Sequence, residues 1–339
     1  MKYLSLFSGI GGFELGIQKA HEDLQNILPS GESKHEGEDT TSMGSRRLDT
    51  KFATGLGHPL CVGFSEIDKY AVKIYQKHFP EHKNYGDITK ISASELPDFD
   101  CLVGGFPCQT FSIAGKRRGF DDTRGTLFFD IARILKEKRP RLFILENVKG
   151  LLSHDSGRTF KVIITTLTEL GYDLQWQVLN SKNHGVPQNR ERVFIIGHIR
   201  GSARPQVFPL GVSDKEYPDE TNEQGCASTL TGRSAGGTNR RGNYVVGILR
   251  THKDGQGFRK LKSGLSPTIP ARAREDGSGQ PVINVDMKIR RLTPRECERL
   301  QGFPDDWTDS VSDTQRYKCL GNAVTVNVIR DIFIKIINS

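Results

Sequence analysis

The sequence predicts an α/β fold, in which a doubly wound, mostly parallel sheet is joined to a smaller domain rich in β-strands and loops. Three observations predict it. Short apolar runs alternate with amphipathic stretches over about the first two hundred residues, glycine-rich turns interrupt that alternation, and the helical stripes stop near Gly201. The length of 339 residues exceeds the usual size of one hydrophobic core, so one large and one smaller domain are expected.

Short apolar runs in the first part of the chain are expected to form buried strands. Helical patterns lie between them, and strands that alternate with helices indicate a sheet covered on both faces. The runs are Tyr3 to Phe7, Leu60 to Phe64, Cys101 to Gly104, Leu142 to Leu145 and Val193 to Ile199.

Helical spacing is clearest in two places. An apolar stripe from Leu127 to Leu135 begins beyond a glycine-rich loop. Near the end of the sequence, Val324, Val328, Ile332 and Ile336 recur four residues apart. We expect this last helix to pack back on the first domain.

Two stretches break the alternation of strands and helices. Residues from about 21 to 57 are dominated by Gly, Ser, Thr, Glu and Asp, which predicts a mobile surface insertion. From about 201 to 286, glycines, prolines and short β-prone pairs replace the helical stripes. We therefore expect one domain at residues 1–200 and 308–339, and a second, with the segment that supports it, at residues 201–307.

The positive charge of the chain is concentrated in the second predicted domain. The whole chain has a formal net charge of +8. Residues 224–274 carry ten Lys and Arg against one acid, Asp254, with nine glycines among them. Glycines interleaved with positive charge are typical of loops that approach a phosphate backbone, although a solvated basic face is the simpler alternative. The distribution favours a nucleic acid as the partner.

The six cysteines show neither a CxxC spacing nor a cluster with histidine. The sequence therefore predicts no zinc site and no disulfide framework, and a reducing cytoplasm is the simpler setting. No apolar run approaches the roughly 20 residues that span a bilayer. We expect a soluble, cytoplasmic protein with no metal and no membrane partner.

A glycine turn follows the first predicted strand. It contains Phe7, Gly9, Gly11 and Gly12, and such a turn lets backbone N–H groups approach a ligand at a helix N-terminus. Glu14 occupies the place of the third glycine in a dinucleotide-binding fingerprint, so that fingerprint is not met.

Two acids are expected at the ends of the next strands. Glu66 ends one strand, where a carboxylate can accept hydrogen bonds from ribose hydroxyls. Asp87, after Gly86, is expected to end another strand, where it could receive an adenine amino group. For each acid considered singly, an exposed residue at a strand end is the commoner case.

Reactive groups from three further segments are expected at the same edge of the sheet. Cys108 follows a predicted strand in a loop of Gly and Pro, where a thiolate could be stabilised, although most cysteines are inert and buried. The strand at 142–145 delivers Glu146, for which a solvated carboxylate is the alternative. In extended chain, Arg190 and Arg192 project to one side as a fork of donors, unless they are a surface pair.

These segments resemble the motifs of the cytosine-5 DNA methyltransferase family of the prokaryotic or phage restriction-modification type. The resemblance covers nearly the whole chain and keeps the order of the family. The matching segments are Phe7 to Gly12, Gly105 to Gln109, Glu146 to Val148, Gln188 to Arg192, Arg291 to Glu296, Gly302 to Pro304, and Gly321 to Val324. The departures are the insertion after the first motif and Ala323, where many members carry serine.

The resemblance implies the S-adenosylmethionine-dependent methyltransferase fold, S-adenosylmethionine as cofactor, and DNA (cytosine-5-)-methyltransferase activity. Cys108 would add to carbon 6 of a flipped-out cytosine, while protonated Glu146 hydrogen-bonds the adjacent ring nitrogen. Arg192, with Arg190, would hold the cytosine carbonyl oxygen. The implied cofactor-binding residues are Phe7, Gly9, Gly11, Gly12, Glu66, Ile67, Asp87, Ile88, Pro107, Leu127, Asn322 and Val324.

The resemblance also implies a catalytic domain followed by a target-recognition domain at residues 201–307. The loop from Gln109 to Arg124 is expected to close over DNA as a lid. Gln256 is expected to fill the space that the flipped cytosine leaves, although a solvent-exposed turn is the more frequent fate of such a residue. The predicted DNA-binding residues are Gln109, Ser112, Lys116, Arg117, Arg118, Arg250, Gln256, Arg259, Thr268 and Arg272.

Three alternatives remain open. An RNA cytosine-5 methyltransferase would use the same catalytic residues, and a catalytically silent DNA-binding homologue would keep the same fold. A nicotinamide-dependent oxidoreductase is disfavoured by the missing third glycine and by the basic domain. We expect a monomer that binds duplex DNA, with a cognate restriction endonuclease as a genetic partner.

Overall fold

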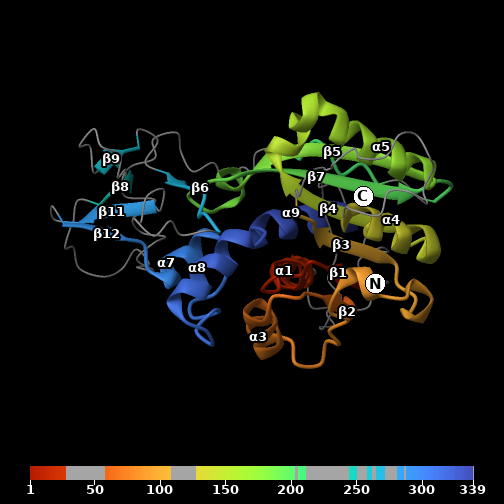
Figure 1. Ribbon diagram of the computed structural model, residues 1–339, viewed down its shortest axis with the longest axis horizontal. Helices are drawn as coiled ribbons and strands as arrows, with labels where there is room; N and C mark the ends of the chain where they lie inside the picture. Colours follow the sequence, from red (N-terminus) through yellow and green to blue (C-terminus); the bar gives the residue numbers. More distant parts are fainter. Residues whose placement is uncertain are drawn as a thin grey trace, which may run out of the picture.

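The computed structural model describes residues 1–27, 58–107, 127–202, 205–210, 244–249, 258–261, 265–271, 281–285 and 288–338. Figure 1 shows a large sheet with helices packed against it and a smaller sheet at the other end of the molecule.

The large sheet is mostly parallel. Its strands are β1 (Lys2–Leu6), β2 (Leu60–Ser65), β3 (Cys101–Gly105), β4 (Leu142–Val148), β5 (Tyr172–Asn180) and β7 (Glu191–Ile199). Their order is β2-β1-β3-β4-β7-β5, and β7 runs antiparallel to both of its neighbours, whereas β1 to β4 pair in parallel. The predicted fold class is confirmed, and all the strands predicted from apolar runs are present.

Helices cover both faces of the large sheet. The described residues form α1 (Gly12–Ile27), α3 (Lys69–His78), α4 (Leu127–Lys138), α5 (Arg158–Glu169), α7 (Pro294–Leu300), α8 (Asp313–Asn322) and α9 (Val326–Ile337). Short 3₁₀ helices are η1 (Ile88–Lys90), η2 (Ala93–Glu95), η4 (Lys149–Leu152), η5 (His154–Gly157) and η6 (Ser181–His184). The two helices expected from apolar stripes are α4 and α9.

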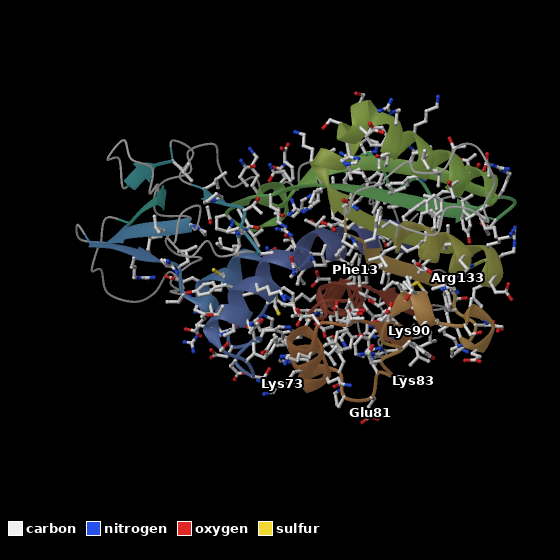
Figure 2. The ribbon with its side chains drawn as sticks, viewed as in Figure 1. Phe13, Lys73, Glu81, Lys83, Lys90 and Arg133 are labelled. Carbon is white, nitrogen blue, oxygen red and sulfur yellow. The ribbon has the colours of Figure 1, made fainter. Side chains whose placement is uncertain are left out.

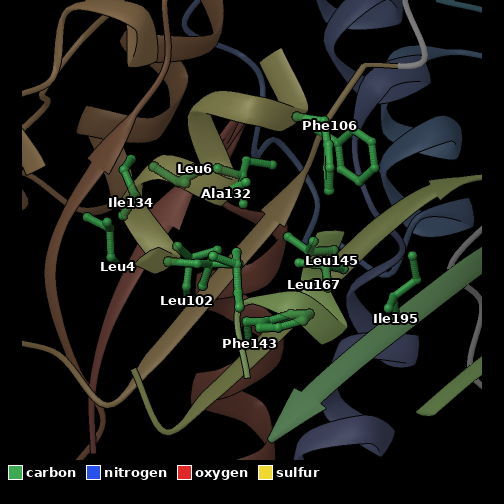
Figure 3. Packing of buried hydrophobic residues seen from close by; sticks show 14 of the residues in the cluster. Leu4, Leu6, Leu102, Phe106, Ala132, Ile134, Phe143, Leu145, Leu167 and Ile195 are labelled. Carbon is green, nitrogen blue, oxygen red and sulfur yellow. The ribbon is translucent and has the colours of Figure 1, made fainter. Parts of the chain in front are cut away.

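Successive side chains of each strand enter opposite cores, because they alternate across the sheet. On one face Leu102 and Phe143 pack with residues of α4 and α5 (Figure 3). On the other face Val103 and Ile144 pack with residues of α1 and α9. The last helix therefore packs on the first domain, as predicted.

The helices α1 and α9 approach each other closely at Gly16. A Cβ atom at this position would lie 2.6 Å from the Cβ of Ile329 and 2.9 Å from the carbonyl oxygen of Val326. Because neither contact is sterically possible, the absence of a side chain at Gly16 allows the two helices to pack.

The strand β5 is not predicted by the sequence, because polar residues interrupt its apolar pattern. Two of them, Gln175 and Gln177, bind the backbone of residues 205–210. The side-chain oxygen of Gln175 accepts the N–H of Val207 (3.0 Å), and that of Gln177 accepts the N–H of Leu210 (2.9 Å). Val207 is fully buried in the core of the large sheet. The chain after β7 thus begins as part of that core.

The smaller sheet is antiparallel, with the order β12-β11-β8-β9. Its strands, together with the short parallel pair β6 and β10, are β6 (Gln188–Asn189), β8 (Tyr244–Leu249), β9 (Phe258–Lys260), β10 (Ser266–Pro267), β11 (Pro281–Val285) and β12 (Lys288–Arg291). All of them except β6 lie within residues 201–307, the range predicted for the second domain. The boundaries themselves stay a prediction.

A third apolar cluster joins α3, α7 and α8. It includes Ile10, which follows β1, and Trp307, which lies between α7 and α8. Ile74 and Tyr75 of α3 are fully buried in it, whereas Lys73 on the opposite side of α3 points outward (Figure 2).

Two sequence-based expectations are wrong in part. The predicted insertion at 21–57 begins too early, because α1 continues to Ile27; residues 28–57 lie outside the described part of the chain. Asp87 does not follow a strand. The chain before it makes a single parallel bridge, between Asn84 and Phe64, and Asp87 instead caps η1.

Candidate active site

A cleft of about 390 Å³ lies at the carboxyl ends of β1 to β4. Ligands of doubly wound sheets bind at this edge. The predicted site residues that line the cleft are Phe7, Gly9, Glu66, Ile67, Asp87, Ile88, Pro107, Leu127, Glu146, Arg190, Arg192 and Asn322.

The β1–α1 loop (residues 7–11) forms one wall of the cleft. Its backbone has positive φ angles at Phe7 (53°), Gly9 (56°) and Gly11 (88°). A Cβ atom at Gly11 would lie 2.6 Å from the ring of Phe79, so a side chain there would be excluded by both the dihedral angle and the contact. The absence of a side chain at Gly11 therefore allows the loop to pack against Phe79.

Glu66 is held in a fixed orientation by backbone N–H groups. One of its carboxylate oxygens accepts the N–H of Gly9 (2.9 Å), which ties it to the β1–α1 loop. The other accepts the N–H groups of Ile67 and Asp68, each at 2.8 Å. The side chain of Ile67 is 74 % exposed at the rim of the cleft.

Asp87 presents an ionised carboxylate to the cleft. One oxygen accepts both the hydroxyl (2.8 Å) and the N–H (3.0 Å) of Thr89. The hydrogen bonds from Thr89 lower the pKa of Asp87 below its ordinary value. The turn before it is fixed by the hydroxyl of Ser65, which donates to the carbonyl of Gly86 (2.6 Å).

Glu146 at the end of β4 forms an ion pair with Arg192. The Nε atom of Arg192 lies 3.1 Å from a carboxylate oxygen of Glu146, and both side chains are largely buried. Burial raises the pKa of Glu146, and the positive charge of Arg192 opposes that rise. Gly105 leaves room for the carboxylate, because a Cβ atom there would be 3.1 Å from its second oxygen. The cleft thus contains a carboxyl group whose pKa lies above its ordinary value.

Arg190 is 2 % exposed and binds the turn between α8 and α9. Its guanidinium donates to the carbonyl oxygens of Gly321 (3.3 Å) and Ala323 (2.7 Å). Burial lowers the pKa of Arg190 to about 9. Arg190 and Arg192 therefore bind different partners, and the expectation of a single fork is wrong.

Asn147 is a functional candidate that the sequence reasoning treats only as a turn residue. Its amide donates to the carbonyl oxygen of Phe106 (2.8 Å), and its own oxygen accepts the N–H of Val148 (2.9 Å). Because Phe106 and Pro107 immediately precede Cys108, Asn147 fixes the backbone that leads to the predicted nucleophile. The signal in the sequence is its position directly after Glu146.

Other predicted residues do not line the cleft. Gly12 and Val324 pack against each other, since a Cβ atom on Gly12 would lie 2.8 Å from a methyl group of Val324. Thr268 donates its hydroxyl to the carbonyl oxygen of Asn189 (3.0 Å), and Arg259 belongs to β9. Residues outside the described part of the chain are Cys108, Gln109, Ser112, Lys116, Arg117, Arg118, Arg250, Gln256 and Arg272.

A family model described as C-5 cytosine-specific DNA methylase matches residues 52–338. The chain belongs to the C-5 cytosine-specific DNA methylase family. Membership of the C-5 cytosine-specific DNA methylases confirms the predicted enzyme class, a DNA (cytosine-5-)-methyltransferase.

The similar curated proteins are bacterial type II methyltransferases. M1.ScrFI of Lactococcus lactis subsp. cremoris is 40 % identical over 98 % of this chain and 76 % of its own length. M.SsoII of Shigella sonnei is 44 % identical over 81 % of this chain and 73 % of its own. M.HhaI of Haemophilus parahaemolyticus is 36 % identical over 98 % of this chain and 93 % of its own length.

Solved structures share the fold at lower identity. The Dnmt2 methyltransferase of S. pombe superposes with a TM-score of 0.67 at 18 % identity, covering 99 % of this chain and 98 % of its own. A putative DNA modification methyltransferase encoded within an E. coli prophage gives 0.57 at 19 % identity, with 99 % and 98 % covered.

Within the described ranges, no helix is long and apolar enough to cross a membrane. The same residues contain no group of three or more His, Cys, Asp or Glu side chains that could hold a metal ion.

Proposed function

We propose that the chain transfers a methyl group from S-adenosylmethionine to carbon 5 of a flipped-out cytosine in a specific duplex DNA sequence, through a covalent adduct of Cys108. The observation that carries this proposal is the carboxyl group of Glu146. It is buried, its pKa is raised, and it lies beside Arg192 at the edge of the sheet to which Phe106 and Pro107 lead.

The acceptors and apolar residues of the cleft suit S-adenosylmethionine. Glu66, oriented by three backbone N–H groups, is a ready acceptor for ribose hydroxyls, and Asp87 is an ionised acceptor for an adenine amino group. Ile67 is an exposed apolar side chain that a flat ring would cover. Phe7 and Gly9 on one side and Leu127 on the other complete the pocket. When bound, the cofactor supplies an electrophilic methyl group.

The residues of the chain solve a problem of reactivity, because carbon 5 of cytosine is a poor nucleophile. The thiolate of Cys108 adds to carbon 6, and Glu146 donates its proton to ring nitrogen N3, which offsets the developing charge. The electron density released in this way reaches carbon 5. Once carbon 5 carries the methyl group, loss of its proton to a base expels the thiolate, and return of the ring-nitrogen proton to Glu146 restores the ring.

The two arginines have separate roles in the proposed reaction. Arg192 orients Glu146 and meets the cytosine carbonyl oxygen with its remaining N–H groups. Arg190 holds the turn at Gly321 and Ala323, beside Asn322 in the cleft. Asn147 keeps the backbone before Cys108 in place.

The remaining predictions concern DNA and cellular context. The target cytosine must leave the stacked duplex, at a cost of a few kcal/mol. Gln256 would occupy the vacated space, and the loop from Gln109 to Arg124 would close on phosphates with Lys116, Arg117 and Arg118. Because similar proteins are named type II methyltransferases, we propose a cytoplasmic monomer that protects the target sequence from a cognate endonuclease.

Trapping on duplex DNA that contains 5-fluorocytosine tests the function. The fluorine prevents the last elimination, so the wild type should form an adduct that survives denaturing electrophoresis, and Cys108→Ser should form none. As a matched control, Cys297→Ala removes a buried cysteine of α7 and should still be trapped.

The same assay separates the alternatives. An adduct with tRNA in place of duplex DNA would point to an RNA methyltransferase. DNA binding without any adduct would point to a silent homologue, and full methylation by Cys108→Ser would refute the covalent mechanism. Bisulfite sequencing of plasmid DNA from cells that express the chain would identify the target sequence.

A further inference from the structure

The segment between α7 and α8 contacts the β1–α1 loop from nearly the other end of the sequence. Trp307 of this segment is 7 % exposed. Its indole N–H donates to the carbonyl oxygen of Ile10 at 2.9 Å, a hydrogen bond that spans 297 residues of sequence. Ile10 is itself buried and lines the cleft. A carbonyl group of the β1–α1 loop is therefore held by a residue outside the loop.

The ring of Trp307 is fixed from several sides. His78 at the end of α3 stacks on it, with ring centroids 3.6 Å apart and an angle of 4° between the planes. The Nε2 atom of His78 donates to the carbonyl oxygen of Trp307 at 2.7 Å. The rings of Phe79 and Phe303 also pack against Trp307, with their centroids 6.0 and 5.5 Å from the centroid of the indole ring. Because the ring cannot turn, the direction of its N–H is set before any ligand arrives.

Residues 307–318 also hold α3 in place. This helix begins shortly after Glu66, which lines the cleft. Lys318 of α8 donates to Asp68, the residue that caps α3, at 2.6 Å. At the other end of α3, Lys77 pairs with Asp309. The two walls of the cleft that the cofactor would touch are thus both fastened to residues 307–318.

We propose that Trp307 is a positioning residue for cofactor binding. Its N–H keeps the Ile10 carbonyl, and with it the β1–α1 loop, in the conformation that the cofactor requires. The protein then has less ordering to complete when the cofactor binds, which tightens affinity without changing the chemical step. This inference rests on the proposed role of the loop in binding S-adenosylmethionine.

The variant Trp307→Phe tests the proposal, because phenylalanine keeps an aromatic ring and loses the N–H. The buried carbonyl of Ile10 is then left without its donor. We expect the dissociation constant for S-adenosylmethionine, measured by calorimetry without DNA, to rise about fivefold to twentyfold. The KM for the cofactor should rise in parallel, with kcat at saturation within about twofold of the wild type. Amide hydrogen exchange over residues 7–12 should accelerate in the cofactor-free protein.

Tyr172→Phe is the matched control. It removes a buried O–H that donates to the carbonyl oxygen of Pro140 (2.9 Å), also a bond from an aromatic side chain to the backbone, but on β5. It should lower the melting temperature and leave both the cofactor affinity and the exchange of residues 7–12 unchanged. Equal weakening of cofactor binding in Tyr172→Phe would reduce the effect to general stability and overturn the proposal.

Hydrogen exchange separates this inference from the proposed function, since it needs no cofactor. If the wild type did not bind S-adenosylmethionine, the proposed cofactor would fail. If exchange over residues 7–12 and cofactor affinity were the same in Trp307→Phe and in the wild type, the role of Trp307 would fail.

Discussion

At the scale of single residues, the ion pair of Glu146 and Arg192 controls where a proton resides in the cleft. Burial favours the neutral carboxyl group, and the neighbouring guanidinium favours the carboxylate. Arg192 therefore limits the rise in the pKa of Glu146 that burial causes. In the proposed reaction, this balance would let Glu146 donate a proton while Arg192 still holds it in place.

Arg192→Gln should shift the alkaline limb of the pH profile of kcat to higher pH. Removal of the positive charge raises the pKa of Glu146 further, and activity that needs the protonated form persists until the pH passes that pKa. The value of kcat itself should fall by about tenfold to a hundredfold, because Glu146 loses its orienting partner. Single-turnover methylation of duplex DNA across a pH series measures both effects.

Lys149→Gln is the control for that experiment. It removes an exposed cation, which pairs with Glu191 at 2.9 Å on the neighbouring strand, and leaves the Glu146 pair intact. Its alkaline limb should stay in place. An unmoved limb in Arg192→Gln would mean that the two groups are not coupled.

Sequence reasoning finds residues that follow strands and misses bonds that the fold creates. Glu66 and Glu146 are identified because each lies at or just past the carboxyl end of an apolar run, and parallel strands deliver such residues to one edge. The bond from Asn147 to Phe106 depends on the pairing of β4 with β3, which residue order does not reveal. Arg190 is found as a candidate but with the wrong partner, because its carbonyl acceptors come from the far end of the chain.

At the scale of elements, the contact of α1 with α9 depends on the small size of Gly16. Gly16→Ala should lower the free energy of unfolding by about 1 to 3 kcal/mol, because the new methyl group would meet Ile329 and a backbone carbonyl. This cost exceeds the gain of roughly 1 kcal/mol that alanine brings to a helix. Urea denaturation measures the change.

Gly150→Ala provides the comparison, since no atom lies within 4 Å of a Cβ built at that position. Its stability should stay within about 0.5 kcal/mol of the wild type. A Gly16→Ala protein as stable as the wild type would show that the helices can separate at no cost.

Helices and strands whose apolar residues recur at a regular spacing are predictable from the sequence, and those with an irregular spacing are not. The apolar stripe at 127–135 identifies α4 because its period is helical. The strand β5 is hidden because Gln175 and Gln177 bind other backbone instead of facing water. Asp87 is misread because a turn with one bridge resembles the end of a strand.

At the scale of the whole molecule, one buried acid makes stability depend on pH. Glu14 of α1 is fully buried in the core of the protein. Burial raises the pKa of Glu14 to about 7. Because this value lies above that of the unfolded chain, the folded state holds a proton that the unfolded state has released at intermediate pH.

Global stability should therefore decline as the pH rises from about 4.5 to about 7, by roughly 3 kcal/mol from this group, and then level off. Below about pH 4.5 both states are protonated and the penalty disappears. In Glu14→Gln this part of the decline should be absent, because the amide does not titrate. Urea denaturation of both proteins over the pH series measures the difference, and parallel curves would refute the assignment.

Contacts between distant parts of the chain are the least predictable from sequence. The hydrogen bond from Trp307 to Ile10 links two residues whose neighbouring sequences do not indicate that they are in contact. The family motifs nevertheless bring both segments into view, because Ile10 lies in the first motif and Trp307 shortly follows Pro304. The sequence does not reveal that the indole N–H of Trp307 points at the carbonyl oxygen of Ile10.

The glutamines of β5 determine how the chain after β7 is held. Since Gln175 and Gln177 bind residues 205–210, and Val207 is buried, the chain stays attached to the larger sheet past the end of β7 as far as Leu210. Past the end of β7, the attachment of the chain to the larger sheet therefore depends on two amide side chains.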